Sequence, residues 1–171
     1  MKAFFAQHGI EVYVADYAKG QPTCEELEVY TEEVKRYIKE IKPVAIIAHS
    51  MGGIIARYVI ETNPQLEIQK LIILESPNQG IPSWSLPIAK LLGIPPDWPS
   101  TKSMVRGSRF FQQLRHKVAK TRYYNIGGIY SLIFPSIFNL PDVPMKIFIT
   151  RHSVLRKDFR VLRYVLQILQ S

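Results

Sequence analysis

The sequence predicts an α/β protein with a mostly parallel sheet flanked by helices. Short apolar runs of strand length alternate with longer helical patterns. One of these runs, residues 44–48, is apolar at every position, as expected for a strand that is buried on both faces of a parallel sheet. Because 171 residues is the usual size of one domain, we expect a single domain over residues 1–171.

The first half of the chain begins with a predicted strand and a helix. Residues 10–15 are rich in β-branched and aromatic side chains and predict the strand. Thr23 and Glu26 have the spacing of a capping box, which predicts the start of the helix, and Pro43 ends it. The next elements are a central strand at 44–48, a helix around 54–60 and a strand at 71–74.

The second half interrupts this alternation between residues 78 and 121. That stretch is proline-rich, holds both tryptophans and contains a basic helical pattern around 101–119. We expect it to form a lid or cap insertion, at about 81–122, above the sheet. Its apolar face would consist of Trp84, Leu86, Ile88, Leu91, Leu92, Ile94 and Trp98. Beyond it we expect strands at 123–126 and 146–149, an apolar loop at 129–141 and an amphipathic helix at 154–169.

Charge is distributed unevenly along the chain. Residues 1–80 hold 8 of the 22 Lys and Arg and 11 of the 14 Asp and Glu, so the second half is strongly cationic. Its basic stretch at 102–122 suits an anionic membrane surface, and a solvated helix face is an equal alternative. We do not expect nucleic acid as a partner, because aromatic side chains do not alternate with these cations as a stacking platform would require.

Composition also excludes several classes of protein. Cys24 is the only cysteine, which excludes an intrachain disulfide and a thiolate zinc site, and we expect neither a metal nor a cofactor. No apolar run reaches the roughly 18 residues of a membrane span. The apolar run at residues 3–6 is too short for a signal peptide, so we expect a cytoplasmic chain by default.

The clearest chemical signal lies between the strand at 44–48 and the following helix. It reads Ala48-His49-Ser50-Met51-Gly52-Gly53. Small residues at positions 48 and 52 allow a sharp strand-to-helix turn that exposes the Ser50 hydroxyl, which is the arrangement of a nucleophile elbow. The N–H of Met51 would then face a developing oxyanion at the helix N-terminus. This pattern indicates acyl transfer by a serine nucleophile, with His49 in a structural role.

A serine needs a base to remove its proton, and His152 is the candidate. It follows the strand at 146–149 and precedes the final helix, whereas His8 and His116 lack this loop setting.

These motifs resemble those of α/β-hydrolase lipases and esterases, in particular bacterial triacylglycerol lipases. The resemblance covers the turn at 48–53, the stretch 74–80 that opens the lid region in such lipases, and the histidine turn at 151–156. It implies a serine hydrolase of carboxylic esters that uses a Ser-His-acid triad on lipid-like acyl substrates.

The acid is where the sequence departs from the lipase pattern. Ser131 holds the place where the resemblance leads us to expect an aspartate. Two substitutes exist: Glu75, at the end of the strand that follows the nucleophile helix, and Asp142, in the loop before the last predicted strand. We favour Glu75, because the end of a strand next to the nucleophile strand lies near the triad.

The resemblance also implies a loop with a His-Gly stretch that supplies a second oxyanion donor. Residues 1–9 resemble the helix after that loop, so we expect a truncated α/β-hydrolase, the downstream part of a longer reading frame, with weak activity of its own. An acyltransferase or thioesterase on the same residues, and a catalytically impaired relic or membrane-surface binding module, remain alternatives.

Overall fold

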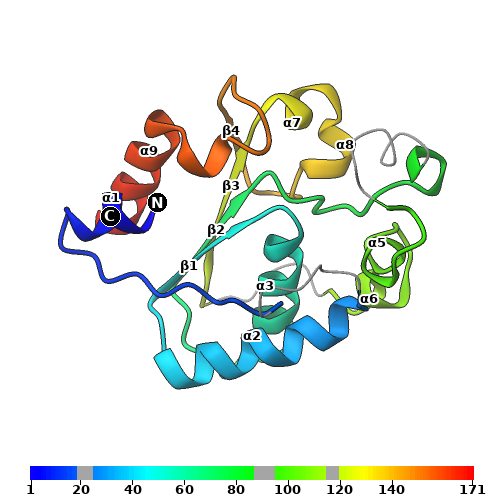
Figure 1. Ribbon diagram of the computed structural model, residues 1–171, viewed down its shortest axis with the longest axis horizontal. Helices are drawn as coiled ribbons and strands as arrows, with labels where there is room; N and C mark the ends of the chain where they lie inside the picture. Colours follow the sequence, from blue (N-terminus) through cyan, green and yellow to red (C-terminus); the bar gives the residue numbers. More distant parts are fainter. Residues whose placement is uncertain (19–24, 87–94, 115–119) are drawn as a thin grey trace.

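The computed structural model describes residues 1–18, 25–86, 95–114 and 120–171. Its centre is a parallel sheet of four strands (Figure 1). They lie side by side in chain order as β1 (Ala45–His49), β2 (Lys70–Leu74), β3 (Arg122–Gly127) and β4 (Met145–Ile147). Leu74 is paired with His49 on one side and with Ile126 on the other, so three strands end level along one edge. The predicted α/β class is confirmed.

Helices cover both faces of this sheet (Figure 1). On one face lie α2 (Leu27–Ile41) and α3 (Met51–Thr62), and on the other lie α1 (Lys2–Ala6) and α9 (Phe159–Gln170). β2 contributes to both hydrophobic cores, because alternate side chains of a strand point to opposite faces. Leu71 and Ile73 belong to the core under α2 and α3, whereas Ile72 and Leu74 belong to the core under α9.

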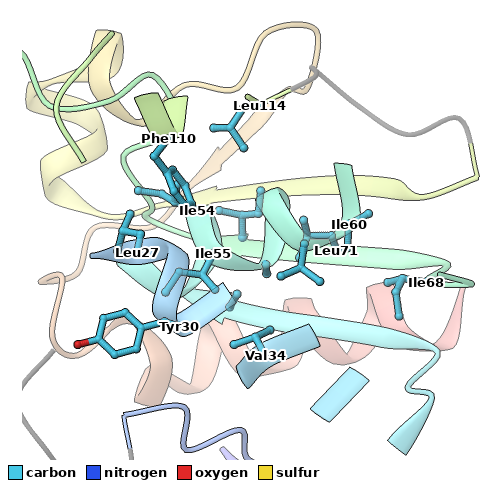
Figure 2. Packing of buried hydrophobic residues seen from close by; sticks show 14 of the residues in the cluster. Leu27, Tyr30, Val34, Ile54, Ile55, Ile60, Ile68, Leu71, Phe110 and Leu114 are labelled. Atoms are coloured by element: carbon cyan, nitrogen blue, oxygen red, sulfur yellow. The ribbon is translucent and has the colours of Figure 1, made fainter. Parts of the chain in front are cut away.

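The core between α2, α3 and the sheet is aliphatic with a few aromatic rings. Figure 2 shows these side chains filling the space between the two helices and the strands. Leu27, Ile54 and Ile55 are completely buried there. Each such side chain stabilises the fold by about 1.5–3 kcal/mol relative to an exposed position, which fixes α3 and the turn before it on the sheet.

One buried ion pair anchors the loop that follows β2. Arg57 of α3 is fully buried, and its Nε lies 2.9 Å from Oε1 of Glu61. Nη1 of Arg57 donates to the carbonyl of Asn78 at 3.0 Å, and Nδ2 of Asn78 donates to the carbonyl of Phe138 at 2.9 Å. The buried guanidinium therefore ties α3 to the loop that leaves the carboxyl end of β2.

The segments that connect these elements are built from short helices. They are η1 (Ser83–Ser85), α5 (Pro99–Ser103), α6 (Arg109–Gln112), α7 (Ile129–Ile133), α8 (Pro135–Phe138) and η2 (Leu155–Lys157). The basic helix expected at 101–119 is therefore replaced by α5 and α6, and its residues 115–119 lie outside the described ranges. The predicted loop at 129–141 contains α7 and α8.

The predicted strand at residues 10–15 is wrong. These residues adopt neither strand nor helix, and Tyr13 and Val14 are 57% and 69% exposed. A strand requires a neighbour to pair with, and within the described ranges β1 pairs only with β2. β1 is accordingly an edge strand of the described sheet, which corrects the expectation that it lies centrally.

The other predicted elements are confirmed with shifted boundaries. α2 begins after Glu26 as its N-cap, and the predicted cap Thr23 lies outside the described residues. α9 begins after Asp158, whose side chain accepts a hydrogen bond from the N–H of Arg160 at 3.0 Å. Among the helices of the described ranges, none has the length and apolar character needed to cross a bilayer.

Candidate active site

Ser50 occupies a sharp turn between β1 and α3. Its φ of 54° lies in the left-handed range that favours glycine, and its ψ is −128°. Its N–H donates to the carbonyl of Leu74 at 3.0 Å, which holds the turn against the end of β2. Such strain on a non-glycine residue, of order 1–3 kcal/mol, is typical of the nucleophile elbow. Met51 is the first residue of α3, where a backbone N–H has no acceptor inside its own helix.

A close approach of α3 to β2 makes this turn possible. A Cβ atom placed on Gly53 would lie 2.0 Å from Oγ of Ser76 and 2.8 Å from its Cβ. Any side chain at position 53 would therefore push the first turn of α3 away from the end of β2. The adjacent Gly52 is less crowded, since a Cβ there would meet only Oη of Tyr17, at 3.7 Å.

Glu75 follows β2 directly and is fully buried. Its Oε2 lies 2.9 Å from Nδ1 of His152. Its Oε1 accepts hydrogen bonds from the N–H groups of Gly128 and Ser131, both at 2.9 Å, and from Oγ of Ser131 at 3.2 Å. Four donors thus surround the carboxylate, and they fix both its position and its orientation.

The pKa of the Glu75 carboxyl reflects this environment. Burial by itself would raise the pKa, because it penalises the charged form. The hydrogen bonds from His152 and from the N–H of Ser131 favour the charged form more strongly and hold the pKa below its ordinary value. Glu75 is therefore an anion at neutral pH, paired with an imidazole.

Gly128 provides the space in which this carboxylate lies. A Cβ on Gly128 would come within 2.9 Å of both carboxylate oxygens of Glu75 and of the carbonyl oxygen of Thr150. The glycine pair at 127–128 was not identified from the sequence as part of the site. The available signal was two consecutive glycines at the end of a predicted strand, where a close approach of the backbone is a common reason for glycine.

His152 lies in the loop after β4 and its side chain is 26% exposed. A carboxylate only accepts hydrogen bonds, so the contact with Glu75 assigns the ring proton to Nδ1 and leaves the lone pair on Nε2. The ring of Tyr130 stacks against the imidazole, with 5.7 Å between the centroids. This is the tautomer in which an imidazole can accept a proton from a nucleophile on its Nε2 side.

His49 connects the serine turn to this histidine. It immediately precedes Ser50, and the centroid of its ring lies 4.5 Å from that of His152. Oγ of Ser50 has no hydrogen-bond partner within the described part of the chain. In the absence of substrate, such hydrogen bonds between nucleophile and base are often long or poorly aligned, and they tighten when substrate binds.

Nε2 of His49 also donates to the main-chain carbonyl of His152, at 2.9 Å. Burial of the His49 ring, followed by its proximity to His152, lowers the pKa of His49 to about 4. His49 is therefore neutral at physiological pH. The sequence indicated a structural role for this residue. The hydrogen bond specifies that role: His49 holds the backbone of the candidate base.

Asp142 lies near the amino end of β4, away from the carboxyl ends of the strands where the site lies. It precedes β4 in an exposed turn with a φ of 56°, whereas His152 follows β4. Residues that precede and follow a strand lie at its opposite ends. The structure therefore brings Glu75, and not Asp142, to the histidine. Ser131, at the place where an aspartate was expected, donates two hydrogen bonds to Glu75.

The other two histidines do not contribute to the site. Nδ1 of His8 donates to the carbonyl of Phe4 at 2.8 Å, and His116 lies outside the described residues. No group of three or more His, Cys, Asp or Glu side chains in the described ranges is arranged to hold a metal ion.

A parallel sheet with helices on both faces and a strained serine turn after a strand is the architecture of the α/β-hydrolase class. Within that class the chain belongs to the palmitoyl protein thioesterase family, whose model matches residues 7–128. Among curated proteins, none matches the sequence.

Solved structures show the same fold at low sequence identity. An extracellular α/β-hydrolase from a Paenibacillus species is 15% identical with a TM-score of 0.62, over 97% of this chain and 89% of that chain. A carboxylesterase structure from the thaumarchaeon Nitrososphaera gargenis is 13% identical with a TM-score of 0.60, over 88% and 74%. A monoacylglycerol lipase from Paleococcus ferrophilus is 15% identical with a TM-score of 0.52, over 88% and 76%.

Proposed function

We propose that this protein is a serine hydrolase of acyl thioesters and carboxylic esters with lipid-like acyl groups. Ser50 is the proposed nucleophile, His152 the general base and Glu75 the acid that orients it. The observation that carries the proposal is the 2.9 Å contact between Nδ1 of His152 and the buried Oε2 of Glu75, at the sheet edge where the Ser50 turn lies. Membership of the palmitoyl protein thioesterase family supports the choice of thioesters as the first substrates to test.

In the proposed reaction, Oγ of Ser50 attacks the acyl carbonyl carbon while Nε2 of His152 takes the hydroxyl proton. The tetrahedral intermediate carries its negative charge on the former carbonyl oxygen, and the N–H of Met51 stabilises it. Collapse of the intermediate releases the thiol or alcohol, which receives the proton from His152. Water then attacks the acyl-serine with the same base, which frees the fatty acid and regenerates Ser50.

The predicted single domain with a lid over about 81–122 stays part of this proposal. Trp84 is 68% exposed, which supports an apolar contact with an acyl substrate. Residues 87–94, which include four side chains of the predicted lid face, lie outside the described ranges. An acyltransferase would use the same residues and differ only in the acceptor that replaces water.

A fluorophosphonate probe tests the nucleophile, and hydrolysis of palmitoyl-coenzyme A and of p-nitrophenyl esters tests the reaction. We expect labelling of the wild-type protein and loss of both labelling and hydrolysis in Ser50→Ala. Ser153→Ala is the matched control, because Ser153 is an exposed serine next to the proposed base. Absence of labelling in folded wild-type protein would overturn the proposal in favour of a non-catalytic relic.

A further inference from the structure

Exposed aliphatic side chains are concentrated beside His152. Ten large hydrophobic side chains of the described residues are exposed, and four of them, all aliphatic, lie between positions 132 and 154. Leu132 and Ile133 of α7 are 59% and 57% exposed. In the loop after β4, Ile149 and Val154 are 75% and 43% exposed. A group of exposed apolar side chains in neighbouring segments is typical of a contact surface.

These side chains come from two segments that lie against each other, residues 129–134 and 149–157, which we call the rim. The N–H of Ile129 donates to the carbonyl of Thr150 at 3.0 Å, and Tyr130 stacks on His152. Figure 1 shows α7 next to the loop after β4 at one end of the sheet. The two segments of the rim are therefore in contact next to the candidate base.

The charge around the rim is positive. Residues 127–141 and 143–157 contain no acid, and they contribute four exposed cations, Lys146, Arg151, Arg156 and Lys157. The acids nearby do not cancel them: Glu75 is buried against His152, and Asp158 accepts hydrogen bonds from Arg160. Asp142 is the one exposed acid between the two segments, and it precedes β4, whereas the rim residues 149–157 follow that strand.

We propose that the rim is the surface with which the protein docks on an anionic lipid bilayer. Aliphatic side chains enter the boundary between head groups and acyl chains, and neighbouring Arg and Lys side chains contact lipid phosphates. Each cation near such a surface strengthens the attraction to anionic head groups. A protein partner is less well matched, because aromatic anchors are prominent in protein interfaces. The exposed apolar side chains of the rim are aliphatic, and its aromatic residues Tyr130 and Phe134 are only partly exposed.

Docking in this orientation brings the carboxyl ends of the strands, with the Ser50 turn, to the bilayer. An acyl group held in the membrane would then reach the serine without being fully transferred to water. This consequence for substrate access rests on the proposed function, whereas the docking itself does not depend on any chemistry at Ser50.

Vesicle co-sedimentation of the Ser50→Ala protein tests the docking separately from catalysis. We expect binding to vesicles of phosphatidylcholine with phosphatidylserine, at least about tenfold weaker binding to phosphatidylcholine alone, and release when NaCl rises from about 0.1 M to about 1 M. The double variant Leu132→Glu with Ile149→Glu should bind the anionic vesicles at least about tenfold more weakly. Both side chains are exposed, so the fold should persist, as thermal unfolding will verify.

Two matched double variants serve as controls. Val29→Glu with Val44→Glu places the same charges on side chains that are 56% and 59% exposed, away from the rim, and should bind like the parent. Lys102→Glu with Arg109→Glu tests the basic stretch at 102–122 and should retain most of the binding. The proposal is overturned if the parent protein does not sediment with anionic vesicles, if the rim variant binds normally, or if only the variant at 102 and 109 loses binding.

Discussion

The ring of His49 donates a hydrogen bond to the main chain of His152, with Nε2 2.9 Å from the carbonyl oxygen. The two residues are 103 positions apart and come from opposite sides of the sheet, β1 at one edge and the loop after β4 at the other. This bond fixes the loop of the candidate base relative to the candidate nucleophile, since Ser50 follows His49 directly.

Removing this donor should misplace the base. In His49→Phe the ring contact with His152 persists, but the carbonyl loses its donor, so we expect kcat for p-nitrophenyl esters to fall about 10- to 100-fold with little change in KM. His49→Gln retains an N–H donor and should recover most of the activity. An unchanged kcat in His49→Phe would show that the bond does not position His152.

His49 should also make the stability of the protein depend on pH. Its pKa in the folded state, about 4, lies below the unfolded value of 6.5, so the unfolded chain binds the proton more readily. The contribution of neutral His49 to the free energy of unfolding is therefore fully present above pH 6.5. It is lost as the pH falls from 6.5 through about 4.

Urea unfolding at about pH 7 and about pH 4.5 measures this effect. We expect wild type to lose about 1–2 kcal/mol more than His49→Gln between the two conditions, after allowance for the partial exposure of the ring. Parallel losses in the two proteins would contradict a neutral, buried His49.

Glu75→Gln should abolish most activity while leaving the fold intact. The amide oxygen can still accept from Gly128 and Ser131, but the amide nitrogen would face Nδ1 of His152 and favour the wrong tautomer. We expect kcat to fall by about 10³–10⁴ with an unchanged circular dichroism spectrum. Asp142→Asn is the matched control and should retain wild-type kcat. The reverse result would identify Asp142 as the acid.

The glycines at the start of α3 should differ sharply in their tolerance of a methyl group. Gly53→Ala would place Cβ within 2.0 Å of Oγ of Ser76, so we expect a loss of about 1–3 kcal/mol in the free energy of unfolding. Gly52→Ala has room, and alanine favours a helix over glycine by about 0.5–1 kcal/mol, so it should leave stability unchanged or raised. Thermal unfolding of both variants checks the pair, and equal effects would contradict the close packing of α3 on β2.

The sequence was sufficient for the elements with strong local patterns. The apolar run at β1, the helix after Ser50 and the amphipathic α9 are each determined by periodicity within one segment. Residues 10–15 have an equally strong local preference for a strand, yet pairing depends on a neighbour elsewhere in the chain, which no local pattern specifies. The same limit explains why β1 was expected at the centre of the sheet.

The site divides in a similar way. Ser50 and His152 belong to contiguous motifs, so their neighbourhood in the sequence identified them as candidates. The choice between Glu75 and Asp142 depended on which end of the strands each residue occupies. The order of the predicted strands along the chain indicated this only in part. The contributions of Gly128, Ser131 and His49 are contacts over more than 50 positions, and they emerge only once the strands are side by side.

The position of β1 at the end of the strand order has a consequence for the serine turn. Within the described ranges its backbone hydrogen-bonds to β2 on one side, and the other side presents N–H and C=O groups of the kind that accept an added strand. A peptide that bound there would extend the sheet directly beside His49, one residue before the strained turn. The conformation of the Ser50 turn would therefore respond to whatever pairs with this side of β1.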